Sequence, residues 1–227
     1  MNIVLDNFDL YVRAFGYTVA LFLVSGVLSM VMGTFLVACR VSPVGILRKA
    51  AATYVTIVRN TPLVIMFAFF SFVAPKFDIT FGWVDFHIGR WDFTSFFAAA
   101  SVSLTLYTSV FVCEGLRSGV NAVPLGQAEA ARAVGLPFGG VMTQVILPQA
   151  FRASVPPLAS VQIALLKNTS VAAVFGVAEA VAQMRSFTND FPTERNGIFV
   201  CFAAGYIVLV AIVSFFASRL ERHWRVA

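Results

Sequence analysis

Long uncharged runs dominate the pattern of apolar and polar positions along this chain. A helix needs about 20 mostly apolar residues to cross the hydrocarbon core of a bilayer. Five runs approach or exceed this length, and in chain order they cover residues 14–39, 55–73, 93–113, 157–178 and 196–218. Three of them carry no charge, whereas the second has Arg59 near its start and the fourth contains Lys167. The pattern predicts an all-α, polytopic membrane protein with five transmembrane helices.

The charges between these spans alternate from one loop to the next. The first loop, up to Arg59, carries four basic residues and no acid, while the second and fourth loops each carry three acids and two bases. Cytoplasmic loops of membrane proteins are enriched in Lys and Arg. We therefore expect the N-terminal tail, residues 1–13, outside the membrane. The loop at residues 114–156 and the tail at residues 219–227 are expected in the cytoplasm.

Composition narrows the possible functions. The chain is 59% hydrophobic and 12% charged, far from the balance of a soluble domain. Its net charge of +5 comes from residues dispersed between apolar runs, without the basic and aromatic face that nucleic-acid binding needs. The three cysteines form no CxxC pair, and His87 and His223 fall on opposite sides of the membrane, so no metal site is expected. No Ser, His and Asp grouping is placed for nucleophilic catalysis, and no enzymatic activity is expected.

Prolines and glycines divide the internal loop into two short helices. Pro124 suits a first helical turn, the alanine-rich run at residues 128–134 has high helix propensity, and Gly135 can supply a left-handed C-terminal cap. Pro137 is predicted to start the second helix. That helix should end near Pro148, because proline lacks the amide hydrogen and clashes with the preceding turn.

The first of these helices has an unusual surface. Glu129 is expected in its first turn, where the helix dipole favours a negative charge, and it can pair with Arg132 three residues on. Four small alanines leave the helix thin enough to enter a groove on another protein closely. The alternative is an ordinary cytosolic loop helix with good intrinsic propensity.

The internal loop also carries a motif with fixed spacing. Its residues are Glu129, Ala130, Ala131, Gly135, Val145, Leu147 and Pro148. This spacing resembles the EAA motif of ABC importer membrane subunits, with Val145 where that motif usually has isoleucine. Four further stretches are similar to the polar amino-acid branch of those permeases, which includes histidine, glutamine and glutamate systems: RNTP (59–62), EGLRSG (114–119), GQAEAARAVGL (126–136) and LLKNTS (165–170). The resemblance covers residues 14–218.

The resemblance implies a type I ABC importer permease in the cell membrane of a prokaryote. The EAA helix would be the coupling helix, and the residues that would seat it in an ATPase are Gly126, Glu129, Ala130, Ala131, Gly135, Leu147 and Pro148. The implied partners are a second permease subunit, identical or homologous, two ATPase subunits and an external substrate-binding protein. None of the three lysines follows a glycine as a P-loop requires, so the chain should bind no cofactor, with ATP and Mg²⁺ on the ATPase.

Polar residues inside the spans are candidates for a substrate path. Lys167, with Asn168, Thr169 and Ser170, can line a hydrated path, because a lysine inside a span costs about 2.5 to 3.5 kcal/mol unless it reaches water or a partner. Snorkelling of Lys167 is the structural alternative. The remaining candidates are Arg59, Asn60, Thr61 and Glu114.

Two of these candidates have a structural explanation: Arg59 can be a positive-inside anchor, and Glu114 can pair with Arg117. Asn60 and Thr61 can instead satisfy backbone groups freed by the proline that follows them and form part of a gate. Because the in-span charges are basic, the expected substrate is glutamate, aspartate or glutamine. The alternative function is a non-transporting membrane scaffold that recruits a cytoplasmic partner.

Small residues recur along the first span. Ser25, Ser29 and Gly33 lie four residues apart and therefore share one helix face. Such a ridge lets another helix approach closely, as is common between transmembrane helices. We expect this face to pack inside the bundle.

Overall fold

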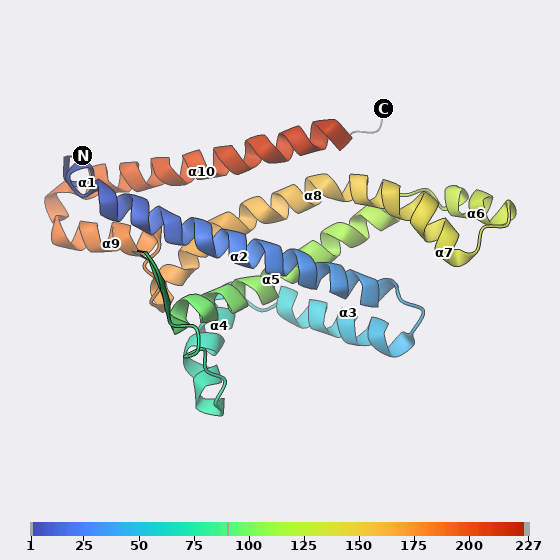
Figure 1. Ribbon diagram of the computed structural model, residues 1–227, viewed down its shortest axis with the longest axis horizontal. Helices are drawn as coiled ribbons and strands as arrows, with labels where there is room; N and C mark the ends of the chain where they lie inside the picture. Colours follow the sequence, from blue (N-terminus) through green and yellow to red (C-terminus); the bar gives the residue numbers. More distant parts are fainter. Residues whose placement is uncertain (1, 90, 225–227) are drawn as a thin grey trace.

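A computed structural model describes residues 2–89 and 91–224 and shows an elongated bundle of helices (Figure 1). The α-helices are α1 (Asn2–Asp6), α2 (Phe8–Val41), α3 (Gly45–Arg59), α4 (Leu63–Ala68), α5 (Ser95–Asn121), α6 (Leu125–Ala133), α7 (Phe138–Gly140), α8 (Leu147–Asn168), α9 (Ala180–Asp190) and α10 (Arg195–Trp224). The π-helical turns are η1 (Phe69–Val73) and η3 (Val141–Ile146), and the 3-10 turns are η2 (Ala74–Phe77), η4 (Thr169–Phe175) and η5 (Pro192–Glu194). One antiparallel hairpin joins β1 (Phe86–Ile88) to β2 (Trp91–Phe93).

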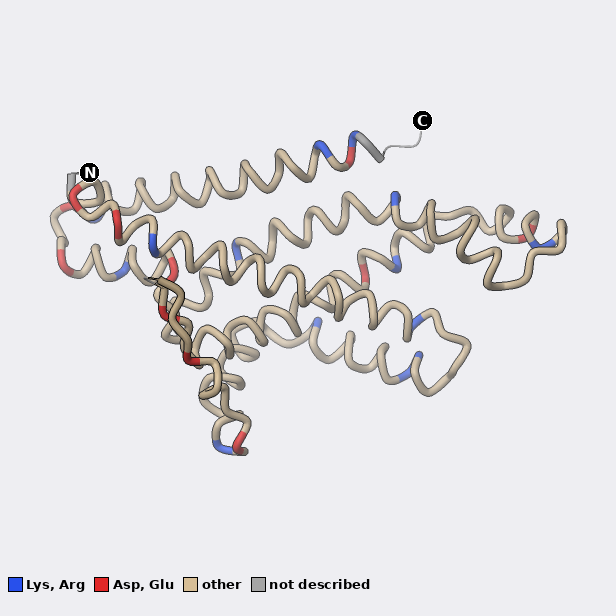
Figure 2. Tube along the Cα trace, in the orientation of Figure 1, with Lys and Arg blue, Asp and Glu red and all other residues tan. Residues whose placement is uncertain are grey.

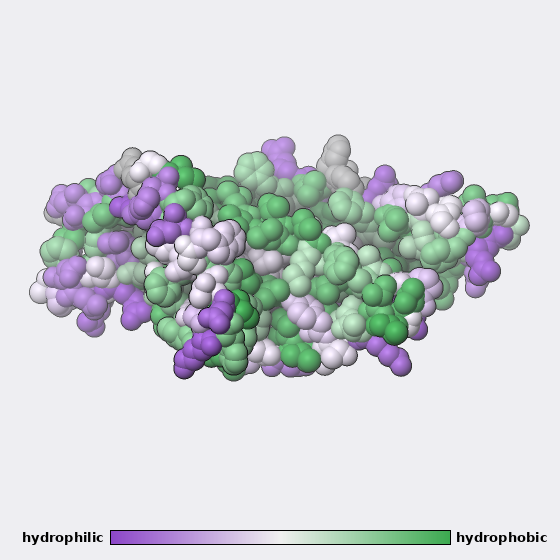
Figure 3. All heavy atoms as spheres, turned by 60° about the horizontal axis from the view of Figure 1, so that its bottom comes forward, coloured by the Kyte–Doolittle hydropathy of each residue, from purple (hydrophilic) through white to green (hydrophobic). Residues whose placement is uncertain are grey.

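The long helices run along the long axis of the molecule. Within the described residues, four segments are long and apolar enough to cross a membrane: Phe8–Val41, Ser95–Asn121, Phe138–Phe175 and Pro192–Arg222. Apolar side chains form a broad belt between two more hydrophilic ends (Figure 3). This arrangement is that of a polytopic α-helical membrane protein, as the sequence predicts.

Close helix crossings hold the centre of the bundle together. Ser25 and Ser29 of α2 are fully buried, and a Cβ atom on Gly33 would lie 2.5 Å from Cγ1 of Val112 in α5. The predicted small-residue face of the first span therefore packs inside the bundle, against α5. The core beside it includes Leu21 and Leu104, each with no exposed surface.

The second predicted span, residues 55–73, is not one straight helix. α3 ends at Arg59 and the chain resumes at Leu63 with a bend of 101°. Pro62 has no amide hydrogen to donate to the carbonyl of Val58, and the Thr61 amide donates to that carbonyl instead over 3.1 Å. The span is a broken pair of helices, because proline ends the first helix where the apolar pattern alone runs through.

The fourth predicted span begins much earlier than residue 157. Helical structure continues from Phe138 to Phe175, so the predicted helix end near Pro148 is wrong. Pro148 falls in the first turn of α8, directly after the π-helical turn, where its missing amide hydrogen removes no bond of that helix. Two more prolines lie inside α8, and the carbonyls that they leave unbonded belong to Arg152 and Ala153, whose side chains are exposed.

The predicted external segments also contain regular structure. α2 begins at Phe8 rather than residue 14, with Asp9 in its first turn, where the helix dipole favours an acid. The second loop contains the β-hairpin, a small exception to the all-α prediction. The fourth loop contains α9, whose N-terminal amide at Ala182 is capped by Glu179.

Candidate functional site

The EAA segment forms the short helix α6, which lies at the far end of the molecule from the N-terminus (Figure 1). The helix ends in a Schellman motif. The Leu136 amide donates to the Ala131 carbonyl over 3.1 Å, and the Gly135 amide donates to the Arg132 carbonyl over 3.0 Å. Gly135 has φ of +87°, so the predicted left-handed cap is confirmed. Pro137 lies immediately before α7, which confirms the predicted start of the second helix.

The alanines of α6 have two different environments. Ala131 is 7% exposed and packs with Val141 and Ile146, so it anchors α6 to the π-helical turn. Ala130 and Glu129 are exposed on the outside of the helix. Of the central EAA residues, two are therefore available to a partner and one is an internal packing residue.

Two expectations about Glu129 were wrong. α6 begins at Leu125, which places Glu129 in its second turn rather than its first. In the part of the chain that the structure describes, the carboxylate forms no ion pair with Arg132. The helix starts one residue after Pro124, because proline is compatible with a helix entrance. Four residues of α6 therefore precede the acid.

A hollow of about 830 Å³ separates α6 from the end of α5 and the beginning of the next helical segment. Two large apolar side chains of its lining stand exposed, Leu125 at 80% and Phe138 at 72%. The side chains of Gln127 and Gln149 are hydrogen-bonded across the gap between α6 and α8. The Gln149 amide also donates to the Val145 carbonyl over 2.9 Å, so α6 is tied to the base of α8.

The last two coupling candidates lie on α8 rather than on α6. Leu147 is 47% exposed and Pro148 is exposed, both in the first turn of α8. Close packing joins this part of α8 to α5, because a Cβ atom on Gly119 would lie 2.3 Å from the Ala150 carbonyl oxygen. A force applied at α6 thus has a packed route into two membrane-spanning helices.

The four path candidates on the fourth span do not share one surface. Lys167 is exposed and lines a groove of about 600 Å³ with Ser170 and, on α10, Tyr206. Thr169 is fully buried, and its hydroxyl donates to the Leu166 carbonyl over 2.7 Å. Asn168 is half-buried.

The position of Lys167 along its span differs from the sequence expectation. It lies in the last turn of α8, well past the middle of the Phe138–Phe175 segment. A lysine there is favoured by the helix dipole, because the C-terminal end of a helix attracts positive charge.

The side chains at the break of the second span serve the backbone. The Asn60 amide donates to the Thr56 carbonyl over 2.7 Å, and the Thr61 hydroxyl donates to the Ile57 carbonyl over 2.9 Å. The Thr61 contact satisfies a carbonyl left open by the end of α3, as the sequence predicts, whereas the Thr56 carbonyl also accepts the Asn60 backbone amide over 3.3 Å. Arg59 is exposed beside them.

Glu114 is paired with a residue that the sequence pattern did not indicate. Its carboxylate forms an ion pair with Arg40 at the end of α2, whereas Arg117 is exposed. The predicted local pair is wrong because the close crossing of α2 and α5 brings Arg40, far away in sequence, to the carboxylate. Glu114 thus links two spans and does not line either of the grooves described above.

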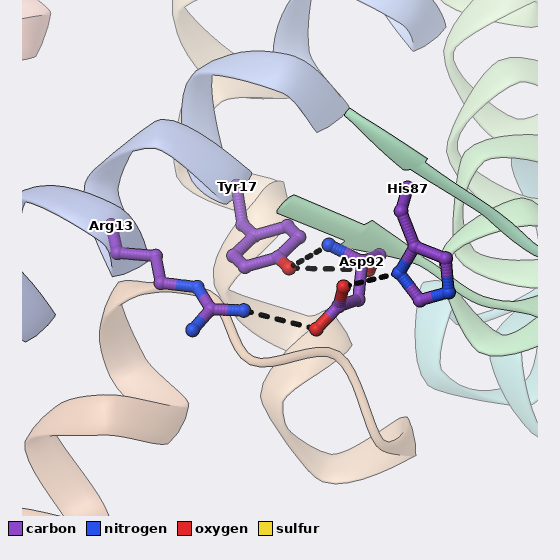
Figure 4. A network of polar contacts seen from close by, with 4 residues as sticks. All are labelled: Arg13, Tyr17, His87 and Asp92. Carbon is purple, nitrogen blue, oxygen red and sulfur yellow. Dashed lines mark hydrogen bonds and ion pairs between the residues drawn. The ribbon is translucent and has the colours of Figure 1, made fainter. Parts of the chain in front are cut away.

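The opposite end of the molecule has its own polar junction. Figure 4 shows Asp92 of the hairpin between Arg13 of α2 and His87 on the facing strand. The Asp92 carboxylate lies 2.5 Å from His87 Nδ1 and 3.1 Å from Arg13, and these contacts, His87 first, lower its pKa. The Tyr17 hydroxyl donates to the Asp92 carbonyl and accepts from the Asp92 amide. The hairpin is therefore fixed to α2.

Sequence reasoning missed a second buried junction near this end. Glu179 has no exposed surface and contacts Thr18 and Tyr206, which lie far apart in the sequence. In the sequence, Glu179 counted only as one acid of an external loop. Its position directly after the apolar run at residues 157–178 and directly before a helix is compatible with a helix cap. Nothing in that pattern indicates the contacts with two other helices.

Comparison with known proteins gives a consistent result. Residues 14–226 match the family described as "Binding-protein-dependent transport system inner membrane component". The glutamate transport system permease protein GluC of Corynebacterium efficiens is 43% identical over 86% of each chain. The arginine transport system permease protein ArtQ of Bacillus subtilis is 31% identical, over 90% of this chain and 88% of that protein.

A solved structure has the same fold. A crystal structure of an amino acid ABC transporter with histidines superimposes with a TM-score of 0.84 at 25% identity, and the match covers 97% of this chain and 96% of that one. The scaffold hypothesis is therefore set aside in favour of transport. The chain belongs to the inner-membrane component family of binding-protein-dependent transport systems, and it is a multi-pass permease subunit of an ABC importer for polar amino acids rather than an enzyme.

Proposed function

We propose that this permease imports glutamate, aspartate or glutamine. The observation that carries the proposal is the groove beside Lys167, whose lining combines an ammonium group and the Ser170 hydroxyl with apolar side chains. Among the described residues that line it, none is acidic. A carboxylate or amide side chain suits such a groove, whereas a cationic side chain would be repelled. The identity of 43% to a glutamate permease supports the same substrate class.

The face for the ATPase subunits is proposed to be the exposed side of α6. It combines Gly126, Glu129 and Ala130 with the apolar Leu125 and Val134 at either end of the helix. A small helix face flanked by large apolar groups fits a cleft on a partner. ATP and Mg²⁺ would then be bound by the ATPase, and this chain would transmit movement through α5 and α8.

The proposed orientation places α6 in the cytoplasm and the hairpin and α9 outside. Lys and Arg predominate at the end that holds α6, whereas acidic residues gather toward the end with the N-terminus and α9 (Figure 2). This distribution follows the positive-inside rule. The external face would receive the amino acid from a substrate-binding protein, and a second permease subunit, identical or homologous, would complete the path.

Uptake into vesicles tests the substrate. The permease is reconstituted with its partner permease, ATPase and binding protein, and ATP-driven uptake of labelled amino acids is compared. We expect glutamate, aspartate or glutamine to be taken up in preference to arginine and histidine. Preferred uptake of arginine, as the name of the 31% identical relative describes, would overturn the electrostatic argument.

Replacement of Lys167 by methionine tests the groove. Methionine keeps most of the side-chain volume but removes the charge, so we expect assembly with the ATPase to be unchanged and uptake to fall at least about tenfold, as for the loss of one charge-assisted hydrogen bond. Uptake is measured per inserted protein. Lys76→Met is the control, because Lys76 is an exposed lysine at the edge of a 3-10 turn that does not line the groove. Equal uptake by both variants would leave only the snorkelling explanation.

A further inference from the structure

The buried carboxyl of Glu179 joins three separate elements. Its side chain has no exposed surface, although it belongs to a short connection between η4 and α9. The Ala182 amide at the start of α9 donates to Oε1 over 2.9 Å, and the Tyr206 hydroxyl of α10 donates to Oε2 over 2.8 Å. The Thr18 hydroxyl of α2 lies 3.5 Å from the same Oε2. One carboxyl therefore fixes α9 to two of the long helices.

A second contact closes this junction. The Ala180 amide donates to the Thr18 hydroxyl oxygen over 3.2 Å, so α9 and α2 are bonded in both directions. Gly176, with φ of +85°, turns the chain just before this point, between the end of η4 and Glu179. The turn folds α9 back against η4 and beside α10.

Tyr206 connects the junction to the groove beside Lys167. Its ring lines that groove together with Ser170 and Val181. The orientation of one wall of the groove therefore depends on a hydroxyl group whose acceptor is the Glu179 carboxyl.

Among the described residues, the neighbours of Glu179 supply hydrogen bonds but no balancing charge. Arg13 of α2 is paired with Asp92, Lys167 of α8 is exposed in the groove, and Tyr206 is the hydrogen-bond donor. The charged side chains of Arg185 and Asp190 on α9 and of Arg195 on α10 are exposed. Burial raises the pKa of the Glu179 carboxyl from 4.5 to about 7. Burying an acid without a cation is costly unless the carboxyl is hydrogen-bonded or neutralised by protonation, and Glu179 has the hydrogen bonds.

We propose that Glu179 is a positioning residue for transport: it anchors α9 to α2 and α10 and thereby holds Tyr206 as a fixed wall of the Lys167 groove. This role rests on the proposed function of that groove as part of the substrate path. Removal of the carboxyl releases the Tyr206 hydroxyl and widens the distribution of its ring positions. Substrate affinity falls as a result, while the membrane-spanning core remains folded.

Transport kinetics in vesicles with the full importer test this role. With whichever polar amino acid the wild type takes up, we expect Glu179→Ala and Tyr206→Phe each to raise KM about three- to tenfold, the range for the loss of one hydrogen bond, with little change in the maximal rate per inserted protein. Glu179→Gln should stay close to wild type, because the amide keeps an acceptor for Ala182 and a hydrogen-bonding group for Tyr206. Asp190→Ala is the control, since it removes an exposed carboxylate from the same helix.

Thermal unfolding at different pH values tests the junction without transport. Because the folded pKa lies above its ordinary value, the stability that the protonated carboxyl contributes is fully present below about pH 4.5 and is lost as the pH rises through about 7. Glutamine does not ionise. The melting temperature of the wild type relative to Glu179→Gln should therefore fall between pH 5.5 and pH 8. The other titrating groups are common to both proteins and cancel.

The outcomes separate this inference from the proposed function. An unchanged KM in Glu179→Ala, with only less protein assembled, would show that the residue is merely structural and would overturn the inference while transport stands. If the wild type takes up none of the amino acids, the proposed function fails, and the melting comparison still decides whether Glu179 holds the junction. If the melting temperatures of the wild type and of Glu179→Gln differ by the same amount at every pH, the role of Glu179 in holding the junction is overturned.

Discussion

Replacing Gly135 by valine is expected to reduce ATP-driven uptake about five- to 150-fold, because a left-handed backbone costs a branched residue about 1 to 3 kcal/mol. Gly135 has φ of +87°, and a Cβ atom there would meet no other atom within 4 Å. The penalty therefore comes from the backbone conformation alone and not from a clash. The chain can relieve it only by unwinding the Schellman cap, which would move α6 away from its seat on the π-helical turn. Under the proposed coupling, ATP hydrolysis would continue with little uptake.

The glycine at position 139 provides a matched control. A Cβ atom on Gly139 also meets nothing within 4 Å, and its φ is not positive, so Gly139→Val adds the same bulk without the strain. Asparagine tolerates the left-handed region, so Gly135→Asn should recover part of the uptake. The measurements are the amount of inserted protein, the amount of ATPase that co-purifies, and the ratio of uptake to hydrolysis. Equal ratios in Gly135→Val and Gly139→Val would exclude the cap as part of the coupling element.

Replacing Gly119 by alanine is expected to destabilise the helix bundle, by about 1 to 3 kcal/mol as in other overpacked cores. A Cβ atom at this position would lie 1.9 Å from Ser154 Oγ and 2.3 Å from the Ala150 carbonyl oxygen. The serine can rotate, but the carbonyl belongs to the backbone of α8 and cannot. The two helices must separate, which breaks the packed route from α6 into the membrane. Uptake and melting temperature should both fall.

Gly115, one helical turn earlier on α5, isolates the effect of the clash. A Cβ atom on Gly115 would make an ordinary contact with Leu158 at 3.5 Å. Alanine is favoured over glycine in a helix interior by about 1 kcal/mol, so Gly115→Ala should be neutral or stabilising. Melting temperatures of both variants are measured in the same detergent. If Gly119→Ala melts as high as Gly115→Ala, the α5–α8 crossing is not rigid.

Local sequence determined the features that depend on a few neighbouring residues. The length of uncharged runs indicates the spans, because the bilayer sets the length of a helix that crosses it. The left-handed cap at Gly135 and the small-residue face at Ser25, Ser29 and Gly33 follow from backbone sterics and from helical periodicity. All of these were predictable because the interacting residues lie within a few positions of one another.

Proline positions were predictable only in part. Pro62 ends a helix and Pro148 does not, although both interrupt an apolar pattern. The difference lies in the preceding turn, which is α-helical before Asn60 and π-helical before Leu147. Whether a chain can widen into a π-helical turn depends on how the turn packs, and Val141 and Ile146 are buried against α6. Sequence pattern carries no information about that support.

Only the tertiary structure decided which distant residues meet. Glu114 finds Arg40 instead of its neighbour Arg117, and Glu179 finds Tyr206 and Thr18, because helix crossings bring these side chains together. The tertiary structure also separated Lys167 and Ser170, which line a groove, from Thr169, which is buried beside it. The sequence thus determined the family, the apolar runs and the EAA motif, all of which are written in local spacing. The charge pairs and the groove depend on contacts across the bundle, and a single sequence does not specify those contacts.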